Sequence, residues 1–158
     1  MKLGTIARQV ASNRRKHEKG AAALEFALVA PLLLMLLLGI VSYGYMLSFR
    51  QGMSQGAAEG ARAAAMAVAA NQSTSAVAAV NQSLSSYGVS CSGTTLVRGT
   101  DTVGTCSVAI APCANDATSQ CATVALDYAY RAHSLVPLPG LGVLMPSDLK
   151  YTAVARVS

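Results

Sequence analysis

The chain has 158 residues, of which 53% are hydrophobic and 12% are charged, a length that suits one small domain plus a membrane-spanning segment. Its formal net charge of +5 lies entirely in residues 1–20, which carry six basic side chains and one acidic one. Residues 21–158 carry six side chains of each sign. No basic patch is left there for nucleic acid, so the sequence argues against a nucleic-acid-binding protein.

A run without any charged side chain extends from Phe26 to Leu47. As a helix, these 22 residues would be about 33 Å long, enough to cross a hydrocarbon core of about 30 Å. We therefore predict a transmembrane helix over residues 21–47. Because basic loops stay in the cytoplasm, residues 1–20 are expected there and the part after Leu47 is expected to be exported. A secretory signal peptide is disfavoured, since its apolar core usually has only about 7–15 residues.

A single acidic residue, Glu25, stands at the head of this run. A carboxylate at the start of a lipid-facing helix is costly without a partner, and such residues are functional candidates. A cut between Gly20 and Ala21 would make Glu25 the fifth residue of the shortened chain. The new amino group would then carry a positive charge that could reach the Glu25 of a neighbouring copy.

The segment Lys19-Gly20-Ala21-Ala22-Ala23-Leu24-Glu25-Phe26 resembles the type IV prepilin signature, in which a basic leader and a glycine precede the cut. With its alanine-rich flanks, Pro31 and the block Glu59-Gly60-Ala61-Arg62, the chain looks most like the TadE-like family of the tight-adherence (Tad, or Flp) pilus system. The resemblance covers roughly Lys19 to Ala65, and the end of the chain only loosely. The alternative reading of the motif is an uncleaved signal anchor with a chance acid.

The resemblance implies a minor pilin or pseudopilin that is involved in pilus assembly. It implies insertion in the bacterial inner membrane, a periplasmic C-terminal domain and, after assembly, a place in the pilus. Its partners would be a membrane prepilin peptidase, other pilin-like subunits and inner-membrane assembly proteins. The processing residues would be Gly20, Ala21, Glu25 and Phe26. Ala21 departs from the Phe or Met that usually begins a major pilin, which puts N-methylation of the new terminus in doubt.

Small residues recur at every fourth position beyond the middle of the apolar run: Gly44, Ser48, Gly52, Gly56, Gly60 and Ala64. This spacing keeps them near one helix face, where another helix could approach closely. The alternative is an alanine-rich helix that contains glycines by composition alone. We predict one helix from about Ala22 to Leu84, with residues 48–88 as an exported extension and Gly88 as a left-handed cap.

Residues 89–158 are rich in Ser, Thr, Gly and β-branched residues and are predicted to form a small exported β-rich domain. The expected strands are Thr94–Val97, Thr105–Ala111, Thr123–Tyr130 and Tyr151–Val157. Apolar residues alternate with others in the second and the last, so each has one apolar face. The predicted fold is α+β, a long helix packed on an antiparallel sheet of three or four strands. The apolar loop over residues 135–146 is expected to tuck under the sheet, the alternative being contact with membrane or a partner.

All four cysteines lie in this exported part, where an even count predicts two disulfides with three possible pairings. We favour Cys113 with Cys121, which would close the loop between two adjacent strands, and therefore Cys91 with Cys106. A metal site is disfavoured, because no C-x-x-C pair occurs and His133 is the only histidine nearby. No cofactor is expected.

The sequence predicts a protein that is not an enzyme. Asp127, His133 and Ser134 are residue types found in hydrolase triads, but neither a nucleophile elbow nor a glycine-rich strand turn accompanies them. The alternative function is an uncleaved, membrane-anchored periplasmic binding or adhesion module.

Overall fold

The structure is a computed structural model that describes residues 3–136 and 145–157, with side chains from Ala22 onward within these ranges. The chain divides into two compact units, Met1–Val41 and Ser42–Ser158. Helix α1, Leu3–Met66, provides all the described secondary structure of the first unit and continues into the second. Pro31 lies inside α1, and the helix continues on both sides of it.

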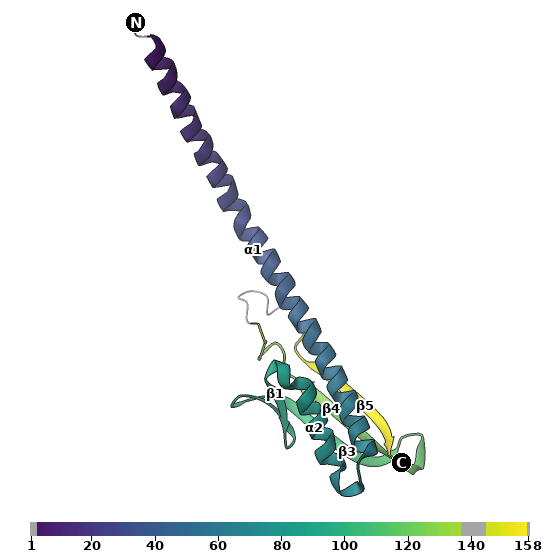
Figure 1. Cartoon of the computed structure of the whole chain (residues 1–158). Coiled ribbons are helices and arrows are strands. Elements are labelled where there is room, and N and C mark those ends of the chain that lie inside the picture. Colours follow the sequence, from purple (N-terminus) through teal and green to yellow (C-terminus); the bar gives the residue numbers. More distant parts are fainter. Residues whose placement is uncertain (1–2, 137–144, 158) are drawn as a thin grey trace. The chain divides into compact units, whose positions relative to one another are not determined.

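The helical part of the second unit is a hairpin and not one continuous helix. α1 ends at Met66, Val68 is extended, and the chain turns through η1 (Ala69–Asn71) into α2 (Gln72–Leu84). α2 then runs back beside the end of α1 (Figure 1). The predicted helix from Ala22 to Leu84 is therefore wrong in its continuity, because reversal buries the apolar stripe of α2 against α1.

The helical region ends where the sequence predicts. η2 (Ser85–Tyr87) follows α2, and Gly88 adopts a left-handed conformation with φ of 67°. Its N–H donates to the carbonyl oxygen of Ser85. A residue with a Cβ is strained at this φ, whereas glycine is not, so the glycine cap is confirmed.

The sheet has five antiparallel strands that lie side by side in chain order. They are β1 (Val89–Ser92), β2 (Thr95–Arg98), β3 (Asp101–Cys113), β4 (Asp116–Tyr128) and β5 (Leu149–Val157). The α+β fold class is confirmed, with one strand, β1, beyond the number predicted. The strand predicted to reach Tyr130 ends at Tyr128. The alternation of apolar and other residues is confirmed in β3 and β5.

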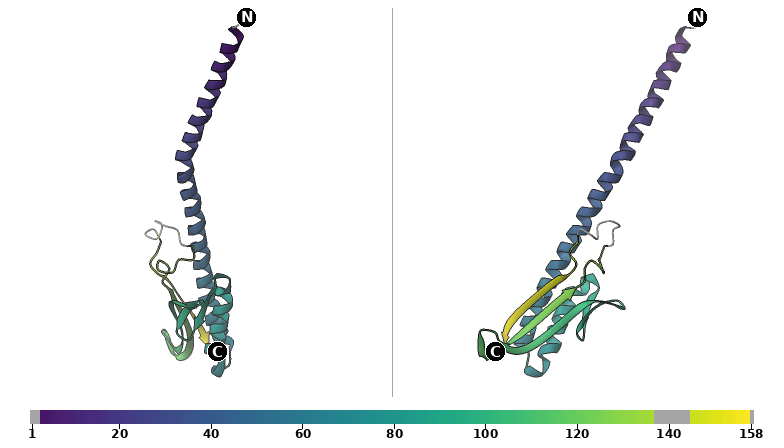
Figure 2. Two further views of the ribbon diagram at one scale, coloured as in Figure 1. Left: turned by 90° about the vertical axis from the view of Figure 1, so that its left-hand side faces the viewer. Right: turned by 180° about the vertical axis from the view of Figure 1, so that it is seen from behind.

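Both helices of the second unit cover one face of the sheet (Figure 2). The core between these layers contains an aromatic cluster in which Phe49 of α1 is central. The ring of Phe49 lies 4.8 Å from that of Tyr128 and 5.0 Å from that of Tyr87, both edge to face. Tyr130 completes the cluster. Such edge-to-face pairs stabilise a core beyond their buried area, which matters where so many other core residues are alanines.

Two disulfides link the strands. Cys91 of β1 is bonded to Cys106 of β3, with Cα atoms 5.8 Å apart, and Cys113 of β3 is bonded to Cys121 of β4, with Cα atoms 5.0 Å apart. This is the pairing favoured from the sequence.

Most of the apolar loop before β5, residues 137–144, lies outside the described residues. Its described ends pack inward: Leu135 contacts the core and Met145 is buried. The Arg131 side chain donates two hydrogen bonds, of 3.2 and 2.7 Å, to the carbonyl oxygen of Met145. These bonds hold the segment before β5 against the domain.

Candidate functional site

The predicted processing residues lie on α1. Gly20 and Ala21 are helical, and every residue from Ala22 to Val29 is exposed. Glu25 makes no ion pair or side-chain hydrogen bond with any described residue, and the Phe26 ring is 71% exposed. Within the described part of the chain, the carboxylate therefore has no counter-charge.

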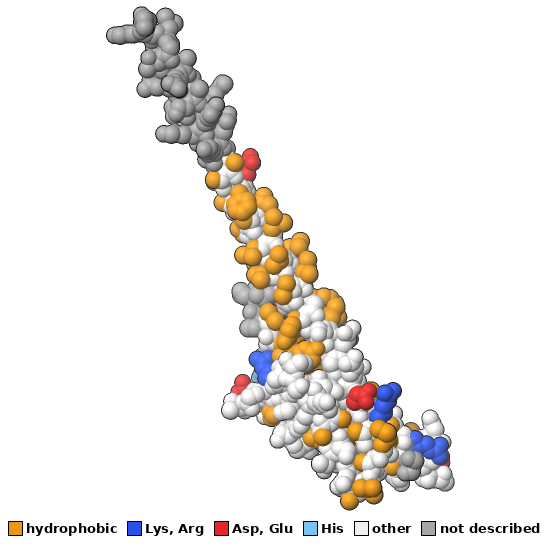
Figure 3. Space-filling model, in the orientation of Figure 1, with side chains coloured by type: hydrophobic (Ala, Val, Ile, Leu, Met, Phe, Trp, Pro, Cys, Tyr) orange, Lys and Arg blue, Asp and Glu red, His pale blue; other side chains and the backbone are white. Residues whose placement is uncertain are grey.

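On the face shown in Figure 3, hydrophobic side chains cover the described part of α1 that belongs to the first unit. The most apolar part of this helix is not buried by any other part of the described structure. Large side chains from Leu24 to Val41 are at least one third exposed. Apolar surface of this extent on a soluble monomer would be unusual, and the helix is long enough to cross a membrane. This helix is a candidate membrane span near the N-terminus.

The row of small residues divides into an open part and an occupied part. A Cβ at Gly44 would meet no atom within 4 Å. At Gly52 it would lie 2.7 Å from the Tyr87 ring, and at Gly60 it would lie 2.8 Å from a Val80 methyl carbon. The close helix approach predicted along this row therefore occurs within the chain, between α1 and its own α2 and η2.

Comparison with known families identifies the N-terminal segment. Residues 20–62 match the family model for TadE-like protein. The matched segment begins at Gly20 and contains Glu25, the apolar run and the block Glu59-Gly60-Ala61-Arg62. The resemblance seen in the sequence is thus confirmed over this TadE-like segment, and it associates the chain with Tad pilus systems. No curated protein and no solved structure matches the chain.

Two long-range contacts that the sequence did not reveal hold the second-unit part of α1 to the rest of that unit. The Tyr87 hydroxyl donates to the carbonyl oxygen of Ser48 at 2.9 Å and lies 2.9 Å from the Ser48 hydroxyl. Arg50 Nε donates to the Tyr151 hydroxyl of β5 at 2.8 Å. These partners are 39 and 101 positions apart, so no local pattern could have indicated them.

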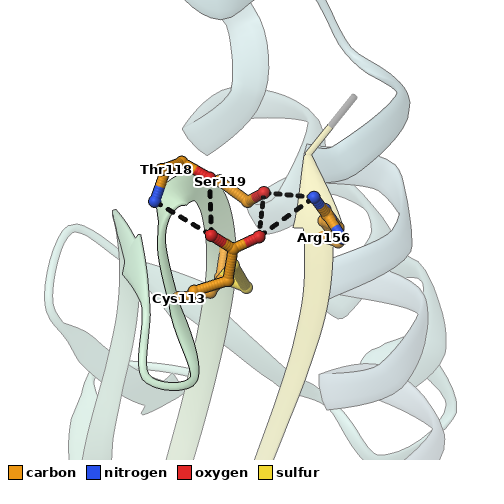
Figure 4. Close-up of polar contacts among 6 residues, drawn as sticks. Cys113, Thr118, Ser119 and Arg156 are labelled. Atoms are coloured by element: carbon orange, nitrogen blue, oxygen red, sulfur yellow. Dashed lines mark hydrogen bonds and ion pairs between the residues drawn. A yellow bond between two sulfur atoms is a disulfide. The ribbon is translucent and has the colours of Figure 1, made fainter.

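A polar cluster closes the β3–β4 hairpin beside the Cys113–Cys121 disulfide (Figure 4). Asp116 accepts hydrogen bonds from the Thr118 hydroxyl at 2.6 Å, the Thr118 N–H at 3.0 Å and the Ser119 hydroxyl at 2.7 Å. These bonds, above all that from the Thr118 hydroxyl, lower the pKa of Asp116. Arg156 of β5 contacts both Asp116 and Ser119. The cluster ties the hairpin to the last strand.

Of the residues weighed for a catalytic triad, Asp127 has another side-chain partner, and His133 forms hydrogen bonds through its backbone. Asp127 forms an ion pair of 2.8 Å with Lys150, which raises the pKa of that lysine. The His133 backbone accepts a hydrogen bond from the Tyr128 hydroxyl and donates one to Ala129. Among the side chains that the structure describes, which begin at Ala22, no group of three or more His, Cys, Asp or Glu could hold a metal ion. The absence of catalysis remains a prediction.

Proposed function

We propose that this chain is a minor pilin or pseudopilin of a Tad/Flp-type pilus and that a prepilin peptidase cuts it after Gly20. One observation carries the proposal: the TadE-like match begins at Gly20 and includes Glu25 at the head of an exposed apolar helix. The cut would leave 138 of the 158 residues.

The proposed role of the cut is to change charge at one end of the span. Residues 1–20 carry five net positive charges, which hold that end of the helix at the cytoplasmic surface. Their removal leaves one new amino group close to Glu25. In an assembly, this amine and the Glu25 carboxylate of a neighbouring subunit would neutralise each other, which lowers the cost of keeping both at the membrane boundary.

Gly20 suits the processing position for two reasons. Without a Cβ, it lets an extended backbone enter a peptidase cleft without steric hindrance. In addition, the bond between Gly20 and Ala21 is helical here, so the helix must open before the cut. Glycine in a helix interior costs about 1 kcal/mol relative to alanine, which makes local opening easier at this position.

The proposed membrane arrangement has residues 1–20 in the cytoplasm and the disulfide-bonded domain in the periplasm, where disulfides form and persist. The partners would be other pilin-like subunits and inner-membrane assembly proteins. Because Gly52, Gly56 and Gly60 already pack against Tyr87 and α2, helix packing between subunits in the assembled pilus would use the face around Gly44, which is open while the chain is still unassembled in the membrane.

The test is the mass of the native N-terminus, measured on protein extracted from membranes of cells with a working prepilin peptidase. The wild-type chain should begin at Ala21, and Gly20→Val should keep the leader. Gly4→Val, a change at another glycine of the leader, is the matched control and should be processed normally. If the wild-type protein still carries Met1, the pilin assignment is overturned, and the uncleaved anchored module takes its place.

A second experiment separates processing from assembly. Glu25→Ala should be cut normally but should enter pilus fractions poorly, because the new amine then lacks its partner. Glu25→Asp keeps the charge and should assemble better than Glu25→Ala. Wild-type piliation with Glu25→Ala would contradict the proposed pairing.

A further inference from the structure

In the last turns of the apolar run, some residues are buried in the domain core and others are exposed. Ser42, Met46 and Phe49 are buried within the second unit. In the same helical turns, Tyr43 is 51% exposed and Tyr45 and Leu47 are each 40% exposed. The domain core therefore begins inside the predicted span. Because residues two positions apart do not share a helix face, Tyr43 and Leu47 lie on one flank of the buried stripe and Tyr45 lies on the other.

The length of the helix places these tyrosines at a membrane boundary. No charged residue occurs between Glu25 and Arg50. If the hydrocarbon begins at Phe26, a core of about 30 Å is crossed after about 20 residues, near Tyr45. Tyrosine is enriched at this depth, because its ring is apolar and its hydroxyl reaches hydrated headgroups.

Arg50 follows Tyr45 by five residues, or about 7.5 Å of helix, which is the level of the lipid phosphates. Its Nε is occupied by the Tyr151 hydroxyl, whereas its two terminal nitrogens make no hydrogen bond with any described residue. The guanidinium is exposed and held in place from one side. Arginine fixed in this way is well suited to bind a phosphate oxygen.

We propose that the domain docks on the exported face of the membrane through Tyr43, Tyr45, Leu47 and Arg50, with a phospholipid headgroup bound by Arg50. The inference rests on the proposed membrane insertion. The Tyr45 ring lies 6.0 Å from the Tyr87 ring, and Arg50 is bonded to Tyr151 of β5. The same residues therefore link the lipid surface to the end of the helical hairpin and to the last strand.

The chain contains no tryptophan, so a single introduced one reports its own depth. Full-length Tyr43→Trp and Tyr45→Trp are reconstituted in vesicles of phosphatidylcholine and phosphatidylglycerol whose acyl chains are brominated either near the headgroup or near the bilayer centre. Both tryptophans should be quenched at least twofold more by the shallow bromines than by the deep ones. Leu34→Trp should show the reverse. Val154→Trp, on the exposed side of β5, should respond only to acrylamide in the water.

The controls separate two kinds of failure. If Leu34→Trp is not quenched by lipid, the span is wrong and the proposed function fails with it. If Leu34→Trp is quenched but Tyr45→Trp behaves like Val154→Trp, only the docking is overturned. A tryptophan at 45 that is shielded from both bromine and acrylamide would mean that another protein copy covers this face, which also overturns lipid docking.

The contribution of Arg50 is measured in the Tyr45→Trp background. Arg50→Gln should reduce shallow quenching by about half or more, because the headgroup contact is lost and the turn moves outward. Arg62→Gln removes an exposed arginine three turns further along α1 and should leave the quenching unchanged. Equal quenching with and without Arg50 would overturn its assignment as the phosphate ligand.

Discussion

Gly60 of α1 faces Val80 of α2 so closely that a methyl group at residue 60 would lie 2.8 Å from a Val80 methyl carbon. The same position is 3.3 Å from the Ala76 carbonyl oxygen and 3.4 Å from a methyl carbon of Val124 in β4. Gly60→Val must therefore push against Val80 and the Ala76 backbone of α2. We expect it to lower the free energy of unfolding by about 1–3 kcal/mol, as overpacking usually does.

Gly44→Val is the matched control, because a Cβ there meets nothing within 4 Å. Valine is somewhat better than glycine in a helix, so this variant should unfold with wild-type stability or slightly above it. Thermal and urea unfolding of the full chain in detergent, followed by circular dichroism, measures both. Equal destabilisation by the two variants would show that the close approach at Gly60 is not what limits stability.

Asn81 acts as a substitute strand partner for β1. Its side-chain oxygen accepts from the Cys91 N–H at 2.6 Å, and its amide nitrogen donates to the Cys91 carbonyl oxygen at 3.2 Å. Asn81→Ala removes both hydrogen bonds and should cost about 1–3 kcal/mol. It should also speed hydrogen exchange at the Cys91 amide.

The sequence Asn-Gln-Ser occurs twice in this region, at residues 71–73 and 81–83. Asn71 begins the first copy as Asn81 begins the second, but Asn71 is exposed and makes no capping hydrogen bond with its side chain. Asn71→Ala should therefore leave both stability and exchange at Cys91 almost unchanged. Comparable loss from the two alanine variants would contradict the role given to Asn81.

Periodic local patterns made the general architecture predictable from the sequence. The charge-free run gave the exposed part of α1, and alternation along Cys106, Val108 and Ile110 gave the inner face of β3. β1 was missed, since Val89 is the only β-branched or aromatic residue among its four. The processing residues were found through the resemblance to TadE-like proteins and not through any structural pattern.

The helix break after Met66 could not be predicted in the same way. Neither glycine nor proline marks it, and the alanines around it favour continued helix. The reversal is explained by tertiary packing, which buries Ala76, Val80 and Leu84 against the glycines of α1. Four-residue spacing indicated that a helix would approach this face but carried no information that the partner lies in the same chain.

The two disulfides should contribute unequally to stability. Their sequence separations of 15 and 8 residues differ by about a factor of two, which changes the loop-closure term by only about 0.6 kcal/mol. Burial accounts for the larger part of the difference in stabilisation between the two disulfides, because Cys91 and Cys106 are only 4% and 1% exposed. The double variant Cys91→Ala/Cys106→Ala should lose about 3–5 kcal/mol, since it also removes packing in the core.

Cys113→Ala/Cys121→Ala should lose less, about 1–3 kcal/mol, because its hairpin is also held by the strand register and by Asp116. Urea unfolding of the two double variants under non-reducing conditions gives the comparison. If Cys113→Ala/Cys121→Ala lost more stability than Cys91→Ala/Cys106→Ala, core packing would not be what makes one disulfide contribute more than the other.

Asp116 should make the stability of the domain depend on pH at its acid limit. Hydrogen bonds from Thr118 and Ser119 hold the pKa of Asp116 below the usual carboxyl value of about 3.9, so the unfolded chain takes up its proton first as the pH falls. The stabilisation is therefore complete above about pH 4 and is lost as the pH falls through the folded pKa.

Asp116→Asn lacks this group, so its stability should fall less steeply below about pH 4 than that of the wild type. Thr118→Ala, which removes the strongest of these bonds, should bring the pKa of Asp116 back toward its usual value in a carboxyl NMR titration. An unchanged slope in Asp116→Asn would show that the cluster does not couple protonation to folding.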